Sequence, residues 1–172
     1  MRTYSLLALV LALFFLLAPQ QSRAQVEVDE TVFKLGPRLT IDVGDLNDMY
    51  GGSFAIGADV RLRTPALPVQ GNGSFDFYFA DDPWTVWSID LNAVYPFGVE
   101  NEVFTPYAGA GLGITRISSD SDIADDTDIG LNIVGGAEFE TGGRATPFVQ
   151  LQATLAGDAD RLGITGGLLF NL

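Results

Sequence analysis

The residues of this sequence that could do chemistry are charged side chains at alternate positions of short apolar segments: Arg38, Asp42, Asp59, Arg61, Asp76, Asp90 and Glu138. Two neighbouring carboxylates, such as Asp59 with Asp76 or Asp90, could act as a general acid and base. The same carboxylates could instead pair with arginine side chains, since buried charges must be paired. The sequence contains no histidine and no cysteine, which removes Ser-His-Asp and Cys-His nucleophile sets. We therefore expect an ion-pair network, with no catalytic residue and no cofactor.

The segments that carry these charges alternate apolar and polar residues. The clearest is 104–117, which reads F-T-P-Y-A-G-A-G-L-G-I-T-R-I. Successive side chains of a strand point to opposite faces, so one face here is hydrocarbon and the other, with glycine at 109, 111 and 113, is nearly bare. Glycines on one face of a strand pack nothing and make sense where that face points into a crowded interior. The pattern favours the inside of a small closed barrel.

Eight such segments follow one another, at about 33–43, 53–63, 74–79, 87–95, 104–117, 129–139, 148–155 and 161–172. Clusters of turn residues separate them, and helical periodicity is absent after residue 24. An even number of alternating segments of about ten residues is typical of transmembrane β-barrels. We expect an all-β fold, an eight-stranded antiparallel up-and-down transmembrane β-barrel over 33–172.

The direction of the two faces follows from the cost of burying charge in lipid. If the polar face pointed outward, side chains such as Arg38, Arg61 and Asp90 would lie in or near hydrocarbon. An arginine at the bilayer midplane costs roughly 2–4 kcal/mol, and several would match the whole stability of a typical domain, about 5–15 kcal/mol. In a membrane, the apolar face must therefore meet lipid and the charges must face the lumen.

The alternative is a soluble, secreted, lipocalin-like barrel whose apolar face lines a cavity for a small apolar ligand. Three features count against it. The polar face is rich in small residues where a water-facing strand usually carries lysine and glutamate. An eight-stranded barrel has an interior just wide enough for side chains, and the large apolar set, which includes Phe75, Phe77 and Trp87, would overfill it. Aromatic residues also gather near the segment ends, as in membrane girdles.

The first 24 residues have the form of a cleavable signal peptide. Arg2 is followed by an unbroken apolar run over 6–18 and by Ser22-Arg23-Ala24, which predicts cleavage before Gln25. Residues 25–32 then form a short leader. The apolar run is too short for a membrane-spanning helix, which needs about 20 residues. The formal charge of −13 excludes a nucleic-acid binder, because no basic patch is available for phosphates.

The chain resembles the small eight-stranded outer-membrane β-barrel proteins, the group that includes the transmembrane domain of outer membrane protein A. The resemblance is carried by Gly36-Pro37-Arg38, by the segments 104–113 and 130–138, and by the closing segment 162–172. It implies the outer membrane of a Gram-negative bacterium, with both termini in the periplasm. It also implies contact with outer-membrane lipid and lipopolysaccharide, and with the barrel-insertion machinery and periplasmic chaperones during biogenesis. The function expected is non-enzymatic, structural or in surface interaction.

Two features of the outer rim have a functional and a plain interpretation. The acidic stretch 118–128 could offer oxygen ligands to calcium or magnesium, but it lacks the glycine and glutamate of an EF-hand loop. We expect a solvated loop and no metal site, with weak candidate ligands at Asp120, Asp122, Asp125, Asp126 and Asp128. Arg116 lies on the lipid-facing register and could reach a lipid phosphate, or it is an ordinary rim residue.

Overall fold

The computed structural model describes residues 30–44, 49–99, 103–119, 126–156 and 160–172, and these residues contain eight strands. The expected signal peptide, 1–24, and most of the expected leader lie outside these residues. The strands are β1 (Val32–Asp42), β2 (Phe54–Arg63), β3 (Gln70–Tyr78), β4 (Trp84–Pro96), β5 (Phe104–Ser119), β6 (Asp126–Phe139), β7 (Ala145–Leu155) and β8 (Arg161–Asn171).

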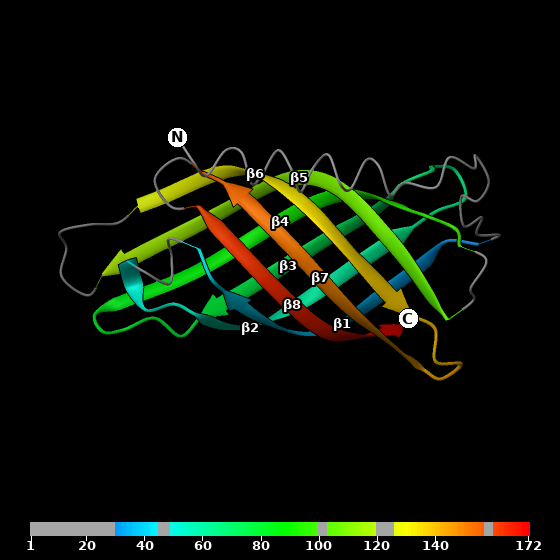
Figure 1. Cartoon of the computed structure of the whole chain (residues 1–172), viewed down its shortest axis with the longest axis horizontal. Helices are drawn as coiled ribbons and strands as arrows, with labels where there is room; N and C mark the ends of the chain where they lie inside the picture. Colours follow the sequence, from blue (N-terminus) through cyan, green and yellow to red (C-terminus); the bar gives the residue numbers. More distant parts are fainter. Residues whose placement is uncertain (1–29, 45–48, 100–102, 120–125, 157–159) are drawn as a thin grey trace.

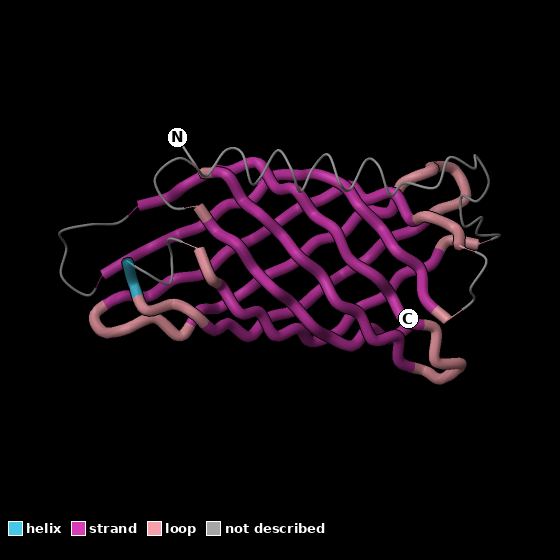
Figure 2. Tube along the Cα trace, in the orientation of Figure 1, coloured by secondary structure: helices cyan, strands magenta, loops and turns pink. Residues whose placement is uncertain are grey.

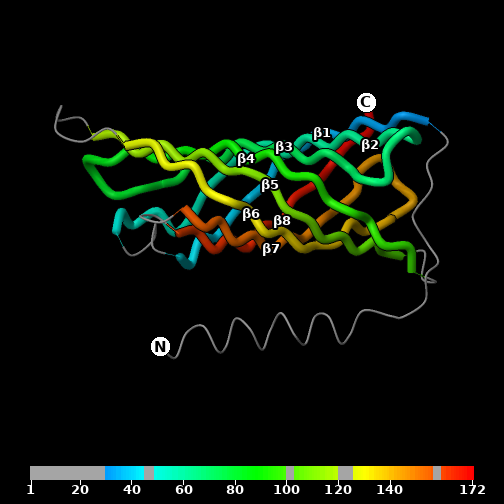
Figure 3. Tube along the Cα trace, turned by 90° about the horizontal axis from the view of Figure 1, so that it is seen from above, coloured from blue at the N-terminus to red at the C-terminus, as the bar shows by residue number. Residues whose placement is uncertain are grey.

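The strands close into one barrel in chain order, and each pairs antiparallel with its neighbours (Figure 1). The barrel closes where β1 pairs with β8, for example Leu39 with Gly166. The strands cross the barrel obliquely (Figures 2 and 3), as closure of a sheet requires. We call the end that carries Val32 and Leu172 the terminal end and the opposite end the far end. The expected eight-stranded up-and-down barrel is confirmed.

Burial alternates along the strands and shows which face is inside. In β4, Asp90 is fully buried and Asn92 is 7 % exposed, whereas Leu91 between them is 66 % exposed. The same alternation occurs in the other strands, so charged and amide side chains fill the interior and large apolar side chains cover the outside. A barrel with this outer face requires lipid around it. The alternative of an apolar lumen for a small apolar ligand is therefore wrong.

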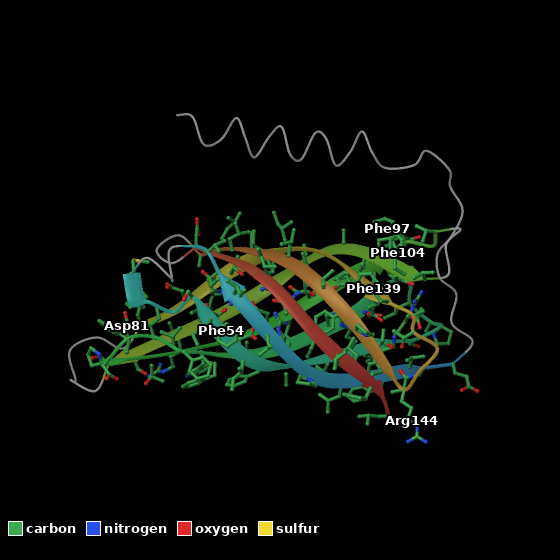
Figure 4. All side chains as sticks on the ribbon, turned by 60° about the horizontal axis from the view of Figure 1, so that its bottom comes forward. Phe54, Asp81, Phe97, Phe104, Phe139 and Arg144 are labelled. Carbon is green, nitrogen blue, oxygen red and sulfur yellow. The ribbon has the colours of Figure 1, made fainter. Side chains whose placement is uncertain are left out.

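Aromatic side chains mark both ends of the apolar surface. Phe97, Phe104 and Phe139 gather toward the terminal end, whereas Phe54 lies toward the far end (Figure 4). The rings of Phe104 and Phe139 lie 6.4 Å apart across β5 and β6. At the far end the ring of Phe54 stacks on that of Phe79 at 5.9 Å. Amphipathic or bulky rings at these heights are typical of the two membrane interfaces.

Several strands begin earlier than the sequence pattern predicted. β3 begins at Gln70, not at Ser74, because Gly71, Asn72 and Gly73 pair with both β2 and β4 and do not form a turn. β4, β6 and β7 likewise begin about three residues earlier, at Trp84, Asp126 and Ala145. Residues that favour turns can remain in a strand when neighbours on both sides complete their backbone hydrogen bonds.

Candidate functional site

The barrel lumen contains all seven charged residues that the sequence singled out. None of them is more than 6 % exposed, and they come from five strands: Arg38, Asp42, Asp59, Arg61, Asp76, Asp90 and Glu138. Each occupies an inward position because strand residues alternate between lumen and lipid. The lumen is therefore the candidate functional site. Its ion pairs gather around Arg61, Arg38 and Arg161, and the first two clusters share Asp59.

The Arg61 cluster lies nearest the terminal end. Arg61 Nη1 donates to Glu138 Oε1 at 2.6 Å, and Arg61 Nε donates to Asp59 Oδ1 at 2.8 Å. The second oxygen of Glu138 accepts from Lys34 Nζ at 2.7 Å. The guanidinium also lies over the rings of Tyr107 and Phe148, at 5.0 and 4.1 Å from their centroids. Hydrogen bonds at the edges of the guanidinium and aromatic rings on its faces therefore compensate for the burial of this charge.

The Arg38 cluster continues the network toward the far end. Arg38 Nη1 donates to Asp59 Oδ2 at 3.2 Å, so both oxygens of Asp59 are bound by arginines. Arg38 Nε forms an ion pair with Asp76 Oδ1 at 3.2 Å, and Nη2 donates to Thr165 Oγ1 at 3.0 Å. Asp59 and Asp76 are thus joined through an arginine. This arrangement supports packing and offers no free general acid or base.

The Arg161 cluster lies nearest the far end and was missed by the sequence analysis. Arg161 Nη2 donates to Asp90 Oδ1 at 2.7 Å. Its Nη1 donates to Ser88 Oγ at 2.9 Å and to Tyr78 Oη at 3.1 Å. Arg161 precedes Gly163 on the inward register of the last strand, which was the available signal. It was overlooked because it stands at the start of the strand, where a rim position is equally consistent with the sequence.

Amide side chains join the ion pairs to the β6–β7 wall. Asn132 Nδ2 donates to Asp90 Oδ1 at 3.0 Å and to Asn92 Oδ1 at 2.9 Å. Thr154 Oγ1 donates to Asn132 Oδ1 at 2.7 Å. Because these bonds cross from β4 to β6 and from β6 to β7, they fix the lumen side chains in one arrangement.

The far end of the lumen is apolar, which the sequence analysis did not predict. Four inward residues from adjacent strands pack together there: Ala55, Tyr78, Val86 and Ile117. The rings of Tyr50 and Trp84 pack against them, with centroids 5.1 Å apart. Asp42, predicted within the ion-pair network, lies at this level and accepts a hydrogen bond from the Gly44 N–H at 2.9 Å. Its position favours capping of the strand end.

Two cavities show how far the lumen is filled. One, between the Arg38 and Arg161 clusters, has a volume of about 10 Å³, roughly the space that one water needs. The other opens at the terminal end and has a volume of about 250 Å³, with Arg61 and Glu138 among its lining residues. The described lumen therefore has little free space between the Arg38 and Arg161 clusters and is hollow near its terminal mouth. Wide aqueous channels need barrels of about 16–18 strands.

Glycines on the inner face make room for the clusters, and this gives a matched pair of substitutions. A methyl group at Gly113 would clash with Asp90 Oδ1 and would lie 2.8 Å from Arg161 Nη2, whereas one at Gly135, on the lipid side, would meet nothing within 4 Å. We expect Gly113→Ala to lower the free energy of unfolding by about 1–3 kcal/mol, as overpacking does. Gly135→Ala should change it by less than about 0.5 kcal/mol. Urea titration in lipid vesicles measures both, and equal effects would contradict the packing described.

The outer-rim candidates lie away from the lumen. Arg116 is on the lipid-facing side of β5, where its Nη1 donates to Thr127 Oγ1 at 3.2 Å. Of the weak metal candidates, Asp120, Asp122 and Asp125 lie outside the described residues, and Asp126 and Asp128 begin β6. Among the residues that the structure describes, no group of three or more His, Cys, Asp or Glu could hold a metal ion.

The barrel can be compared with known protein families. Within the described part of the chain, no helix has the length and apolar character needed to cross a membrane. The family model of the outer membrane protein beta-barrel domain matches residues 7–168. The chain belongs to this outer-membrane barrel family. The protein is therefore an integral β-barrel of the Gram-negative outer membrane.

Solved structures of the same fold agree with this family. The N-terminal barrel domain of Pseudomonas aeruginosa OprF is 19 % identical, with a TM-score of 0.62, and the match covers 83 % of this chain and 98 % of that domain. Neisserial surface protein A is 18 % identical and Ail, the attachment invasion locus protein of Yersinia pestis, is 16 % identical. Each has a TM-score of 0.57, with 83 % of this chain and 97 % of the other chain covered. No curated protein matches the chain significantly.

Proposed function

We propose that this member of the outer-membrane barrel family is non-enzymatic and acts as a structural or surface-interaction component of the outer membrane. The observation that carries the proposal is the lumen. Its carboxylates are bound by arginine, lysine or amide groups at 2.6–3.2 Å. A chain with no histidine lacks the usual base of hydrolytic sites, and a filled lumen disfavours a wide pore.

The arrangement of the ends supports a specific orientation. The terminal end faces the periplasm after removal of residues 1–24 as a signal peptide, and the far end faces the exterior. Insertion by the barrel-assembly machinery, assisted by periplasmic chaperones, follows from this location. Arg116, on the lipid-facing side of the far end, is placed to contact the phosphate of a lipid or of lipopolysaccharide.

Surface interaction is the part of the proposal that depends on the far end. One solved structure of Ail is a complex with the heparin analogue sucrose octasulfate, so a barrel of this fold can carry a ligand. In this chain the described far end exposes acidic groups, including Asp81, Asp82 and Asp126. A cationic partner would complement these charges better than a polyanion.

Membrane fractionation with gel mobility tests the location. We expect the protein in the outer-membrane fraction, and we expect the unheated sample to migrate differently from the boiled one, because the closed barrel stays folded in detergent until heated. A polypeptide that remains folded and monodisperse in plain buffer would overturn the proposal, since the apolar outer surface requires lipid or detergent.

A further inference from the structure

The cavity at the terminal end is a pocket with one closed side. Its volume is about 250 Å³. The Arg61 cluster closes it toward the barrel interior. The wall formed by β1–β3 is cationic or amide, with Lys34, Arg61, Arg63 and Gln70, and carboxylates line it from the β6 side.

Two pairs of oppositely charged residues, an inner pair and an outer pair, lie on opposite sides of this pocket. Only the inner pair forms a hydrogen-bonded ion pair. Arg61 on β2 bonds to Glu138 on β6 at 2.6 Å. Two residues further toward the mouth, on the same inward registers, stand Arg63 and Glu140, which also line the cavity. β2 and β6 are separated by the same number of strands in both directions around the barrel. The outer charges therefore face each other across the mouth.

The inner pair has several hydrogen-bond partners, and the side chains of the outer pair have none among the described residues. Glu138 Oε1 accepts from Arg61 and from Gln70 Nε2 at 3.1 Å, and Oε2 accepts from Lys34. Within the described residues, the Arg63 guanidinium and the Glu140 carboxylate have no hydrogen bond and no ion pair. Arg63 is only partly exposed, so its charge is not fully solvated. A ligand that enters here meets one cation and one anion whose side chains form no hydrogen bond or ion pair with any described residue, although the Glu138 carboxylate lies near enough to act electrostatically on Arg63.

We propose that this pocket binds a small zwitterion, a molecule of amino-acid or dipeptide size that carries one carboxylate and one ammonium group. The carboxylate of the ligand pairs with Arg63 and its ammonium group pairs with Glu140, so the ligand bridges the outer pair of charges. Val32 and Pro96 in the pocket wall provide apolar contact for the body of the ligand. The periplasm as the source of the ligand rests on the proposed orientation, whereas binding itself does not.

Titration of the full chain in detergent micelles, followed by amide NMR shifts, tests the site. The probe is alanyl-alanine, with N-acetyl-alanine as an analogue that has only the negative charge and alanine amide as one that has only the positive charge. Because both charges lie near the mouth and are partly screened, we expect a dissociation constant of about 1 mM for the dipeptide. Each analogue should bind about tenfold more weakly, and the shifts should lie near Arg63 and Glu140.

Three variants decide the result. Arg63→Gln and Glu140→Gln should each weaken binding of the dipeptide about tenfold. Arg144→Gln, a matched change at an exposed arginine in the β6–β7 turn outside the pocket (Figure 4), should leave it unchanged. Absence of saturable binding, equal binding of all three probes, or equal binding by the Arg63 and Arg144 variants would each overturn the proposal. Unchanged gel mobility of the unheated variants shows that the barrel is folded, and it keeps this test separate from that of the proposed surface role.

Discussion

Replacing Asp90 with alanine is expected to lower the free energy of unfolding by about 3–5 kcal/mol. Asp90 is fully buried and Arg161 is 5 % exposed. In the native barrel, Asp90 Oδ1 lies 2.7 Å from Arg161 Nη2 and 3.0 Å from Asn132 Nδ2. Removal of the carboxylate leaves a buried guanidinium whose remaining hydrogen-bond partners among the described residues, Ser88 and Tyr78, are neutral. An uncompensated buried charge costs more than the net value of the pair that it leaves behind.

A double variant separates this explanation from a simple loss of volume. Asp90→Leu with Arg161→Met replaces the ion pair by apolar side chains, and such replacement of a buried pair is often neutral or stabilising. We expect the double variant to recover most of the stability lost by Asp90→Ala. Urea titration in lipid vesicles, with the folded fraction read from unheated gels, measures both. A cost below about 1 kcal/mol for Asp90→Ala would mean that water in the lumen solvates Arg161.

Placing an arginine on the outer face is expected to destabilise the barrel in a depth-dependent manner. Ile133 lies near the middle of β6 and is 51 % exposed on the apolar side. Because arginine at the bilayer midplane costs roughly 2–4 kcal/mol, Ile133→Arg should lower the free energy of unfolding by about that amount. The hydrocarbon of the bilayer provides no partner for the charge at this depth.

A matched substitution on the same strand and the same face provides the control. Ile129 lies four residues closer to the far end and is 68 % exposed, next to the acidic start of β6. Near an interface the cost of an arginine falls to about 0–1 kcal/mol, so Ile129→Arg should be tolerated. The same urea titration in vesicles compares the two. Equal costs at the two positions would argue that this face does not lie in a bilayer.

The pattern of residue types was sufficient to predict the strands that form the wall of the barrel. Alternation in segments such as 104–117 predicted the strands, and the cost of charge in lipid predicted which face is outside. The boundaries were less accurate: residues 70–73, which the pattern left outside the predicted third strand, belong to β3 because β2 and β4 pair with them on both sides. Local propensity carries no information about such neighbours.

The sequence by itself determined which side chains face the lumen, because the period of a strand is two and one misplaced charge in hydrocarbon costs kilocalories. Only the tertiary structure decided which lumen groups meet. Arg61 reaches Glu138 across 77 residues and Arg161 reaches Asp90 across 71. These partners depend on barrel closure and on the stagger between strands, which bring distant residues to the same height. The outer pair, Arg63 and Glu140, could likewise be recognised only in the closed barrel. The sequence around either residue does not show that the other lies opposite.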